Sequence, residues 1–185
     1  MTAIDHAEEA LQAWAEMAPL SFDTLCAGGV IGIGNDDGTL DGLRFPTGRT
    51  WSLVDRCFDG DLTPGIHARH ELALPREHVF ITFDELDRLG VLEVFGLDCA
   101  AITVCRPSRL ARKELSMRLA DKTVTVLASR ETPSTAVSQA QRAVQHAVAV
   151  KLPTSIWAAL GTATNDQLAS VVRTERRAAS VSEAA

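Results

Sequence analysis

The chain contains no tyrosine among its 185 residues. A catalytic tyrosine acts as a nucleophile, an acid or a base, so its absence excludes every mechanism that depends on one, including those of tyrosine recombinases and relaxases. The four cysteines, Cys26, Cys57, Cys99 and Cys105, form no Cys-x-x-Cys pair. We therefore expect free thiols in a reducing compartment, buried mostly as small hydrophobic groups.

Long hydrophobic runs are also missing, and none approaches the ~18 residues that a membrane helix needs. The first residues are acidic and lack the apolar segment of a signal peptide. The sequence therefore predicts a cytoplasmic protein with no membrane association. Its length predicts one domain over 1–175, followed by a flexible tail over 176–185.

Lysine is absent from residues 1–104, which carry six arginines against 18 acidic residues, a formal net charge of −12. Residues 105–185 carry 12 basic against six acidic residues, a net charge of +6. Such asymmetry indicates either a surface that binds polyanions or two halves that attract each other within one fold. The sequence leaves both interpretations open.

The middle of the chain holds its only sustained runs of β-branched and aromatic residues. Each run has the length of a strand and ends at a turn, charge or proline signal. The predicted strands lie near 78–83, 91–95, 100–105 and 122–129. They predict the centre of a mixed β-sheet.

Helices are expected on both sides of this centre. Apolar residues at helical spacing predict a helix over 3–18, and residues 25–58 are expected to form a meander of short strands. The segment from 100 to 129 reads as strand, helix and strand, which is a βαβ unit. The last third is predicted to be helical. The fold class is therefore α+β, with helices from both termini.

The helix of the βαβ unit, at 106–118, carries an unusual concentration of basic residues. On a helix, Arg106, Arg109, Arg112 and Lys113 fall within about a third of the circumference, away from its apolar side. Such a one-sided basic helix is suited to phosphate contacts. We expect these four residues to form a binding site for nucleic acid or another polyanion.

Cofactor and metal signals are weak. Neither Gly32–Gly38 nor Gly42–Thr50 has the spacing of a dinucleotide or phosphate-binding loop, so no cofactor is expected. His67, His70 and Glu71 are of the residue types that hold a catalytic metal. On a strand, however, the two histidines would point to opposite faces. No metal site is therefore expected, with these three residues as the weak alternative.

The function that the sequence favours is a non-catalytic cytoplasmic binding or regulatory protein. Its partner would be nucleic acid, another polyanion or an acidic protein surface, contacted through the basic helix. One alternative is a small metal- or thiol-dependent enzyme with its site near 59–71. Another is a structural subunit of an assembly, in which the C-terminal helices around Trp157 would form the contact, also between copies of the chain. No catalytic residue is assigned.

Overall fold

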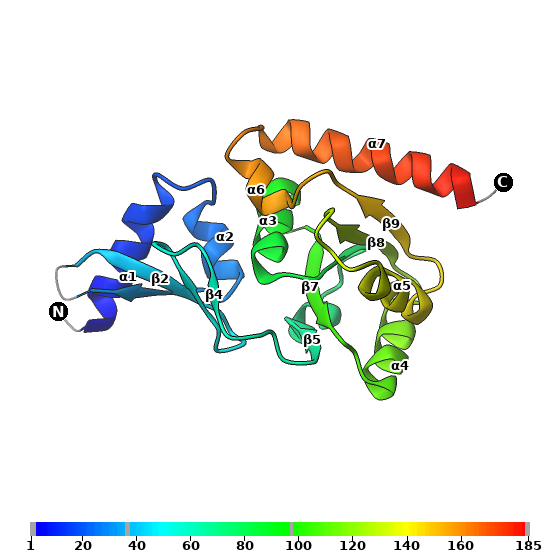
Figure 1. Cartoon of the computed structure of the whole chain (residues 1–185), viewed down its shortest axis with the longest axis horizontal. Coiled ribbons are helices and arrows are strands. Elements are labelled where there is room, and N and C mark those ends of the chain that lie inside the picture. The colour runs from blue at the N-terminus through cyan, green and yellow to red at the C-terminus, as the bar shows by residue number, and fades with distance from the viewer. Residues whose placement is uncertain (1–2, 36–37, 97, 184–185) are drawn as a thin grey trace. The chain divides into compact units, whose positions relative to one another are not determined.

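The structure is a computed structural model that describes residues 3–35, 38–96 and 98–183. It separates into two compact units, Met1–Thr63 and Pro64–Ala185 (Figure 1). The predicted α+β class, with a mixed sheet and helices from both ends, is confirmed. That the chain forms one domain over 1–175 stays a prediction. Among the described residues, no helix combines the length and hydrophobicity needed to cross a bilayer.

The first unit pairs two helices with a small antiparallel sheet. Its elements, in chain order, are α1 (Ala3–Ala15), α2 (Phe22–Ala27), β1 (Ile31–Gly34), β2 (Leu40–Arg44), β3 (Thr50–Ser52) and β4 (Phe58–Asp59). The four strands pair in sequence order, which confirms the expected meander. Helix α1 lies directly on β1, because a Cβ added at Gly32 would come within 2.8 Å of the Ala7 carbonyl oxygen. Glycine at this position permits the close approach.

The second unit is larger and is built around a five-stranded sheet. Its elements, in chain order, are β5 (Gly65–His67), the 3₁₀-helix η1 (Arg69–Ala73), β6 (His78–Thr82), α3 (Glu85–Phe95), β7 (Ala100–Cys105), α4 (Arg109–Arg118), β8 (Thr123–Ala128), α5 (Ser134–Ala143), β9 (Val148–Lys151), α6 (Ile156–Leu160) and α7 (Asn165–Glu183). The strand order is β5-β7-β6-β8-β9. Strand β5 runs antiparallel to β7, and the other pairs are parallel. The sheet is therefore mixed, and α4 completes the predicted βαβ unit between β7 and β8.

Helices cover both faces of this sheet (Figure 1). One face packs against α4 and α5 through a core that includes Val79, Ile81 and Leu115. The opposite face packs against α3, α6 and α7, where Phe80 meets Phe95 with ring centroids 4.6 Å apart. Because neighbouring residues of a strand point to opposite faces, β6 supplies both layers.

The predicted strand at 91–95 is wrong, because these residues complete helix α3. Gly90 reads as the end of a helix in the sequence, yet it lies inside α3. A Cβ at Gly90 would come within 2.8 Å of the Cγ2 of Ile156, so the glycine makes room for α6. Leu89, Val91 and Leu92 are all buried, and a helix buried on several sides loses the periodicity that would identify it.

The C-terminal third also differs from the prediction. Val148–Lys151 forms strand β9 at the sheet edge, where a helical pattern was expected. Helix α7 continues to Glu183, through most of the segment predicted to be a flexible tail. Its Leu168 and Val172 are buried, so apolar contacts with the rest of the unit hold this helix in place.

Candidate nucleic-acid interface

Helix α4 presents its basic side chains to solvent. The Oγ of Ser108 accepts a hydrogen bond from the Ala111 amide at 3.2 Å and fixes the start of the helix. The apolar side of α4 is buried in the sheet core. Three of the predicted basic residues, Arg106, Arg109 and Lys113, are exposed, and Arg112 is half-buried. We call these four residues the α4 basic surface.

The charges of the α4 basic surface are not neutralised within the part of the chain that the structure describes. The one acidic residue of the helix, Glu114, pairs with Arg69 at 3.3 Å and with Arg118 at 3.2 Å. None of the four basic residues forms an ion pair with a described carboxylate. The sequence left open whether these residues pair with the acidic half of the chain, and within the second unit no described carboxylate pairs with them. Four cations therefore remain available to an anionic partner.

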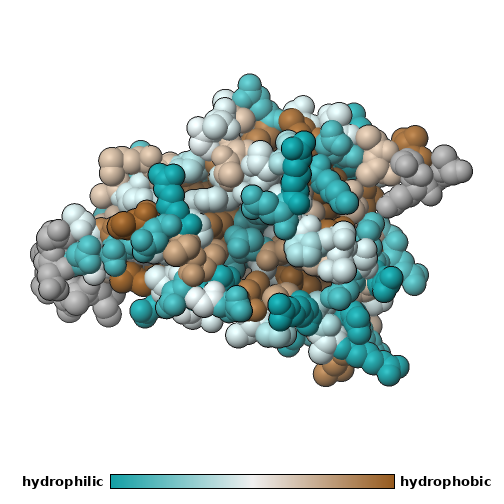
Figure 2. Space-filling model, viewed as in Figure 1, coloured by the Kyte–Doolittle hydropathy of each residue, from teal (hydrophilic) through white to brown (hydrophobic). Residues whose placement is uncertain are grey.

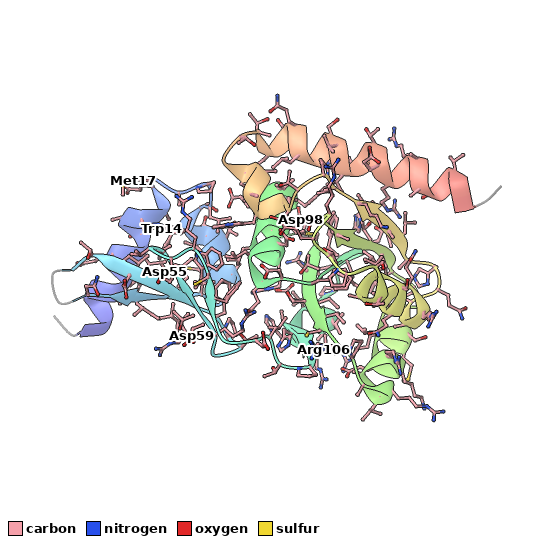
Figure 3. The ribbon with its side chains drawn as sticks, viewed as in Figure 1. Trp14, Met17, Asp55, Asp59, Asp98 and Arg106 are labelled. Atoms are coloured by element: carbon pink, nitrogen blue, oxygen red, sulfur yellow. The ribbon has the colours of Figure 1, made fainter. Side chains whose placement is uncertain are left out.

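Arg106 stands at a special position in the backbone. It follows β7 directly, with a φ of 39° in the left-handed region. Figure 3 labels it at one end of β7 and Asp98 just before the other. A residue without glycine's freedom pays a conformational cost there, and such positions cluster at functional sites. The turn directs the chain from the carboxyl end of β7 toward α4.

The carboxyl edge of the sheet is the place where ligands bind in folds of this kind. Strand β6 is followed by α3 on one face, and its neighbour β8 is followed by α5 on the other, so the chain changes direction between their carboxyl ends. Arg130 lies two residues after the carboxyl end of β8, exposed and without an ion pair among the described residues. Its turn is fixed by Ser129, whose amide donates to the Thr132 hydroxyl at 3.0 Å. Sequence reasoning missed Arg130, although an arginine directly after a buried strand could have indicated it.

Two exposed apolar side chains accompany the cations on α4. Leu110 is 77% exposed and Met117 is 69% exposed. They lie seven residues apart and therefore on the same side of the helix. On the face shown in Figure 2, hydrophilic residues gather where Figure 1 places α4, with a hydrophobic group at the lower edge.

A second cationic site lies on the opposite face of the sheet, and we call it the arginine pocket. It is a hollow of about 290 Å³ between the start of β6, the end of α3 and the middle of α7. Its lining combines three aromatic rings, one aliphatic side chain and three arginines and contains no carboxylate: His78, Phe80, Phe95, Val172, Arg173, Arg176 and Arg177.

The aromatic rings of the arginine pocket are fixed by their neighbours. The rings of His78 and Phe80 stack with centroids 4.4 Å apart. The Nε2 of His78 lies 3.0 Å from the Thr125 hydroxyl oxygen, in hydrogen-bond contact. Burial, together with the positive charges of Arg176 and Arg173, lowers the pKa of His78 to about 4. The imidazole is therefore neutral near pH 7, and the positive charge of the pocket comes from the arginines.

The arginines lie on one side of α7. Positions 173, 176 and 177 are three and four residues apart, which places them together on a helix. The guanidinium carbon of Arg173 lies 6.0 Å from the centre of the Phe95 ring. The Nε of Arg176 is buried and has no hydrogen-bond partner among the described residues. A buried donor without a partner is costly, and an anion in the pocket would satisfy it.

The weak metal alternative is not assembled by the fold. His67 lies in β5, His70 is exposed on η1, and Glu71 is buried. Burial raises the pKa of Glu71, and the positive charges of Arg88, His70 and Arg76 oppose that rise. Within the described ranges, no group of three or more His, Cys, Asp or Glu residues is placed to hold a metal ion.

All four cysteines are free thiols. Cys99 is buried, and burial raises its pKa to about 12, so this thiol is protonated and a poor nucleophile. Cys26 and Cys57 are exposed, which differs from the expectation that the thiols are mostly buried.

Comparisons with known proteins complete the description of this surface. No family model matches the chain. A search of curated proteins also finds no match. Solved structures do match, and two of them come from bacteriophage T7.

The first is a structure of the bacteriophage T7 lagging-strand DNA polymerase interacting with primase domains of two gp4 subunits bound to an RNA/DNA hybrid and dTTP. The match has a TM-score of 0.56 at 14% identity and covers 83% of this chain and 86% of the other. The second is the primase fragment of the T7 primase-helicase, with a TM-score of 0.56 at 12% identity, covering 85% of this chain and 72% of the other. At such identities the likeness establishes a shared fold.

These likenesses correct the function that the sequence favoured. The shared fold is found in the primase part of a DNA-processing enzyme, so the interpretation as a non-catalytic binding or regulatory protein is wrong. The same correction applies to the alternatives of a metal- or thiol-dependent enzyme near 59–71 and of a structural subunit. Sequence reasoning failed here because the fold is shared at 12% and 14% identity, too low for any motif to reveal it.

Proposed function

We propose that this chain is the nucleic-acid-handling domain of a DNA-processing enzyme of the primase kind. The shared fold is the observation that supports the proposal most, because it extends over 83% of the chain. The primase domains in that T7 structure are bound to an RNA/DNA hybrid. We propose nucleic acid as the partner of this chain and the cytoplasm as its location.

The α4 basic surface is the proposed contact for the strand. Its four cations are unpaired among the described residues: Arg109, Arg112 and Lys113 lie on one side of α4, and Arg106 lies in the turn that joins the carboxyl end of β7 to this helix. Each cation that neutralises a phosphate releases a condensed counterion, and this release drives association at low salt. Exposed Leu110 and Met117 add apolar contact area beside the cations. Arg130 would extend the contact to the carboxyl end of β8.

Primer synthesis is a phosphoryl transfer, and enzymes that perform such transfers commonly use two metal ions held by carboxylates. The described residues do not supply such a set. At the carboxyl edge, the Oδ1 of Asp84 accepts a hydrogen bond from the Leu86 amide at 2.8 Å and is thereby committed to capping α3. We therefore assign no metal-dependent step to these residues.

The proposal is tested by fluorescence anisotropy with a labelled single-stranded oligodeoxynucleotide and with an RNA/DNA hybrid at low salt. The variant reverses two charges of the α4 basic surface, Arg109→Glu with Arg112→Glu. The matched control, Arg44→Glu with Arg49→Glu, makes the same change of charge in the first unit. Circular dichroism and the thermal midpoint confirm that each protein is folded.

We expect the native chain to bind both probes and the α4 variant to lose about tenfold or more in affinity, because two phosphate contacts become repulsive. The control should bind within about threefold of the native chain. Absence of binding to both probes at low salt would overturn the proposal. Equal losses in the variant and the control would show that net charge, and not this surface, determines binding.

A further inference from the structure

We propose that the arginine pocket binds a nucleoside 5′-phosphate, with the phosphate against Arg173, Arg176 and Arg177 and the base against the rings of His78 and Phe95. This site goes beyond the proposed function, since it lies on the face of the sheet opposite α4. Strand binding on α4 and nucleotide binding in the pocket can therefore be measured, and can fail, independently.

The size and lining of the pocket select the ligand. A hollow of about 290 Å³ lies at the lower end of the range for small-molecule sites and matches a ligand the size of one nucleotide. The lining combines aromatic rings with guanidinium groups, which suits a ligand with a flat ring and an anionic group. A wholly apolar ligand would leave the arginines unsatisfied.

The arginines form a phosphate clamp. They project from adjacent turns of α7, and no described carboxylate pairs with them. Guanidinium groups bind phosphate oxygens through paired, charge-assisted hydrogen bonds. The buried Nε of Arg176 gains the partner that it lacks in the structure. This unsatisfied donor distinguishes the pocket from an ordinary solvated basic face.

The aromatic part provides the contact for the base. Phe80 is fully buried and serves as the support behind His78 and Phe95, which are both partly exposed. Stacking of a base on a protein ring contributes about 1–3 kcal/mol and tolerates different bases. The imidazole of His78 is neutral, so it can stack and donate or accept one hydrogen bond without adding charge. We therefore expect little selectivity among bases.

The experiment is isothermal titration calorimetry of the full chain with five probes: AMP, adenosine, inorganic phosphate, a 5′-phosphorylated oligonucleotide and the same oligonucleotide without the phosphate. The variants are Arg176→Gln and Arg173→Gln. Glu175→Gln, on the same helix and outside the pocket lining, is the matched control. Because Arg173 is exposed, its variant keeps the test valid if Arg176→Gln fails to fold. The imidazole ¹H resonances of His78 report occupancy of the pocket directly.

We expect AMP to bind more tightly than adenosine and than inorganic phosphate, and to shift the His78 resonances. Each arginine variant should weaken AMP binding about tenfold or more, while Glu175→Gln leaves it unchanged. Stronger binding of the phosphorylated oligonucleotide than of its unphosphorylated form would identify the phosphorylated end of a strand as the ligand. Equal binding of the two oligonucleotides would identify a free nucleotide as the ligand.

The proposal is overturned if adenosine binds as well as AMP, if AMP leaves the His78 resonances in place, or if both arginine variants bind AMP as the native chain does. The Arg109→Glu, Arg112→Glu protein should retain full AMP binding. A loss there as well would indicate a nonspecific effect of charge and would also count against the pocket.

Discussion

The carboxylate of Asp87 joins α3 to α6 and should make the stability of the chain depend on pH. Its Oδ1 accepts a hydrogen bond from the Trp157 amide at 3.1 Å, at the start of α6. Burial raises the pKa of Asp87 from 3.8 to about 6, against the lowering effect of the Trp157 hydrogen bond and with a smaller rise from the charge of Asp84. The folded chain therefore holds a proton on Asp87 more tightly than the unfolded chain does.

The sign of the effect follows from this difference. Between about pH 4 and pH 6 the folded state binds the proton and the unfolded state releases it, so stability falls as pH rises through this window. A difference of about two pKa units corresponds to about 3 kcal/mol. Asp87→Asn removes the titration, while the amide oxygen can still accept from the Trp157 amide. We therefore subtract the free energy of unfolding of the variant from that of the native protein at each pH. This difference should be about 3 kcal/mol higher at pH 3.5 than at pH 7.

Urea unfolding of both proteins across this range measures the difference. Asp121→Asn, which removes an exposed carboxylate, controls for the change in net charge. A difference between native and Asp87→Asn protein that stays constant with pH, or that grows as pH rises, would refute the buried position of this carboxylate. It would also count against the hydrogen bond from the Trp157 amide to Asp87 as the contact that positions α6 against α3.

Two further predictions address the elements around the arginine pocket. Gly90→Ala should destabilise the chain by about 1–3 kcal/mol, because the added methyl group overlaps Ile156, whereas Gly161→Ala meets open space and should be close to neutral in the same denaturation assay. His78 should titrate in nuclear magnetic resonance with a pKa near 4, and because its folded pKa is lowered, it contributes stability that is present above pH 6.5 and lost as pH falls toward 4. A measured pKa at or above 6.5 would contradict the packing of His78 on Phe80 beside the arginines.

The centre of the sheet could be predicted because its strands carry their own signal. Strands β6, β7 and β8 are runs of mostly apolar residues rich in Val, Ile and Thr, and parallel strands covered on both faces take this pattern. Helix α4 was predictable from its apolar stripe, but it begins at Arg109 and not at residue 106 as expected, because the backbone of Arg106 is left-handed and Ser108 caps the helix. The segment at 91–95 was not, because the glycine that ends many helices serves here to admit Ile156. That contact joins residues far apart in the chain and leaves no local pattern.

The α4 basic surface and the arginine pocket also differ in how far the sequence alone could predict them. Three residues of the α4 basic surface, Arg109, Arg112 and Lys113, lie on one helix, so spacing alone could group them, whereas Arg106 precedes the helix in a left-handed turn. The arginine pocket combines the start of β6, the end of α3 and the middle of α7, and the sequence treated residues from Arg176 onward as a tail. Only the packing of α7 on the sheet brings these arginines to His78 and Phe95.

The salt dependence of binding to a single-stranded oligodeoxynucleotide tests the central claim most directly. Four phosphate contacts on the α4 basic surface predict a slope of about −3 for the logarithm of the association constant against the logarithm of salt concentration. The Arg109→Glu, Arg112→Glu protein should show a slope of about −1.4 or shallower. A flat slope for the native chain, or the same slope for both proteins, would contradict the account that this primase-like fold holds nucleic acid through α4.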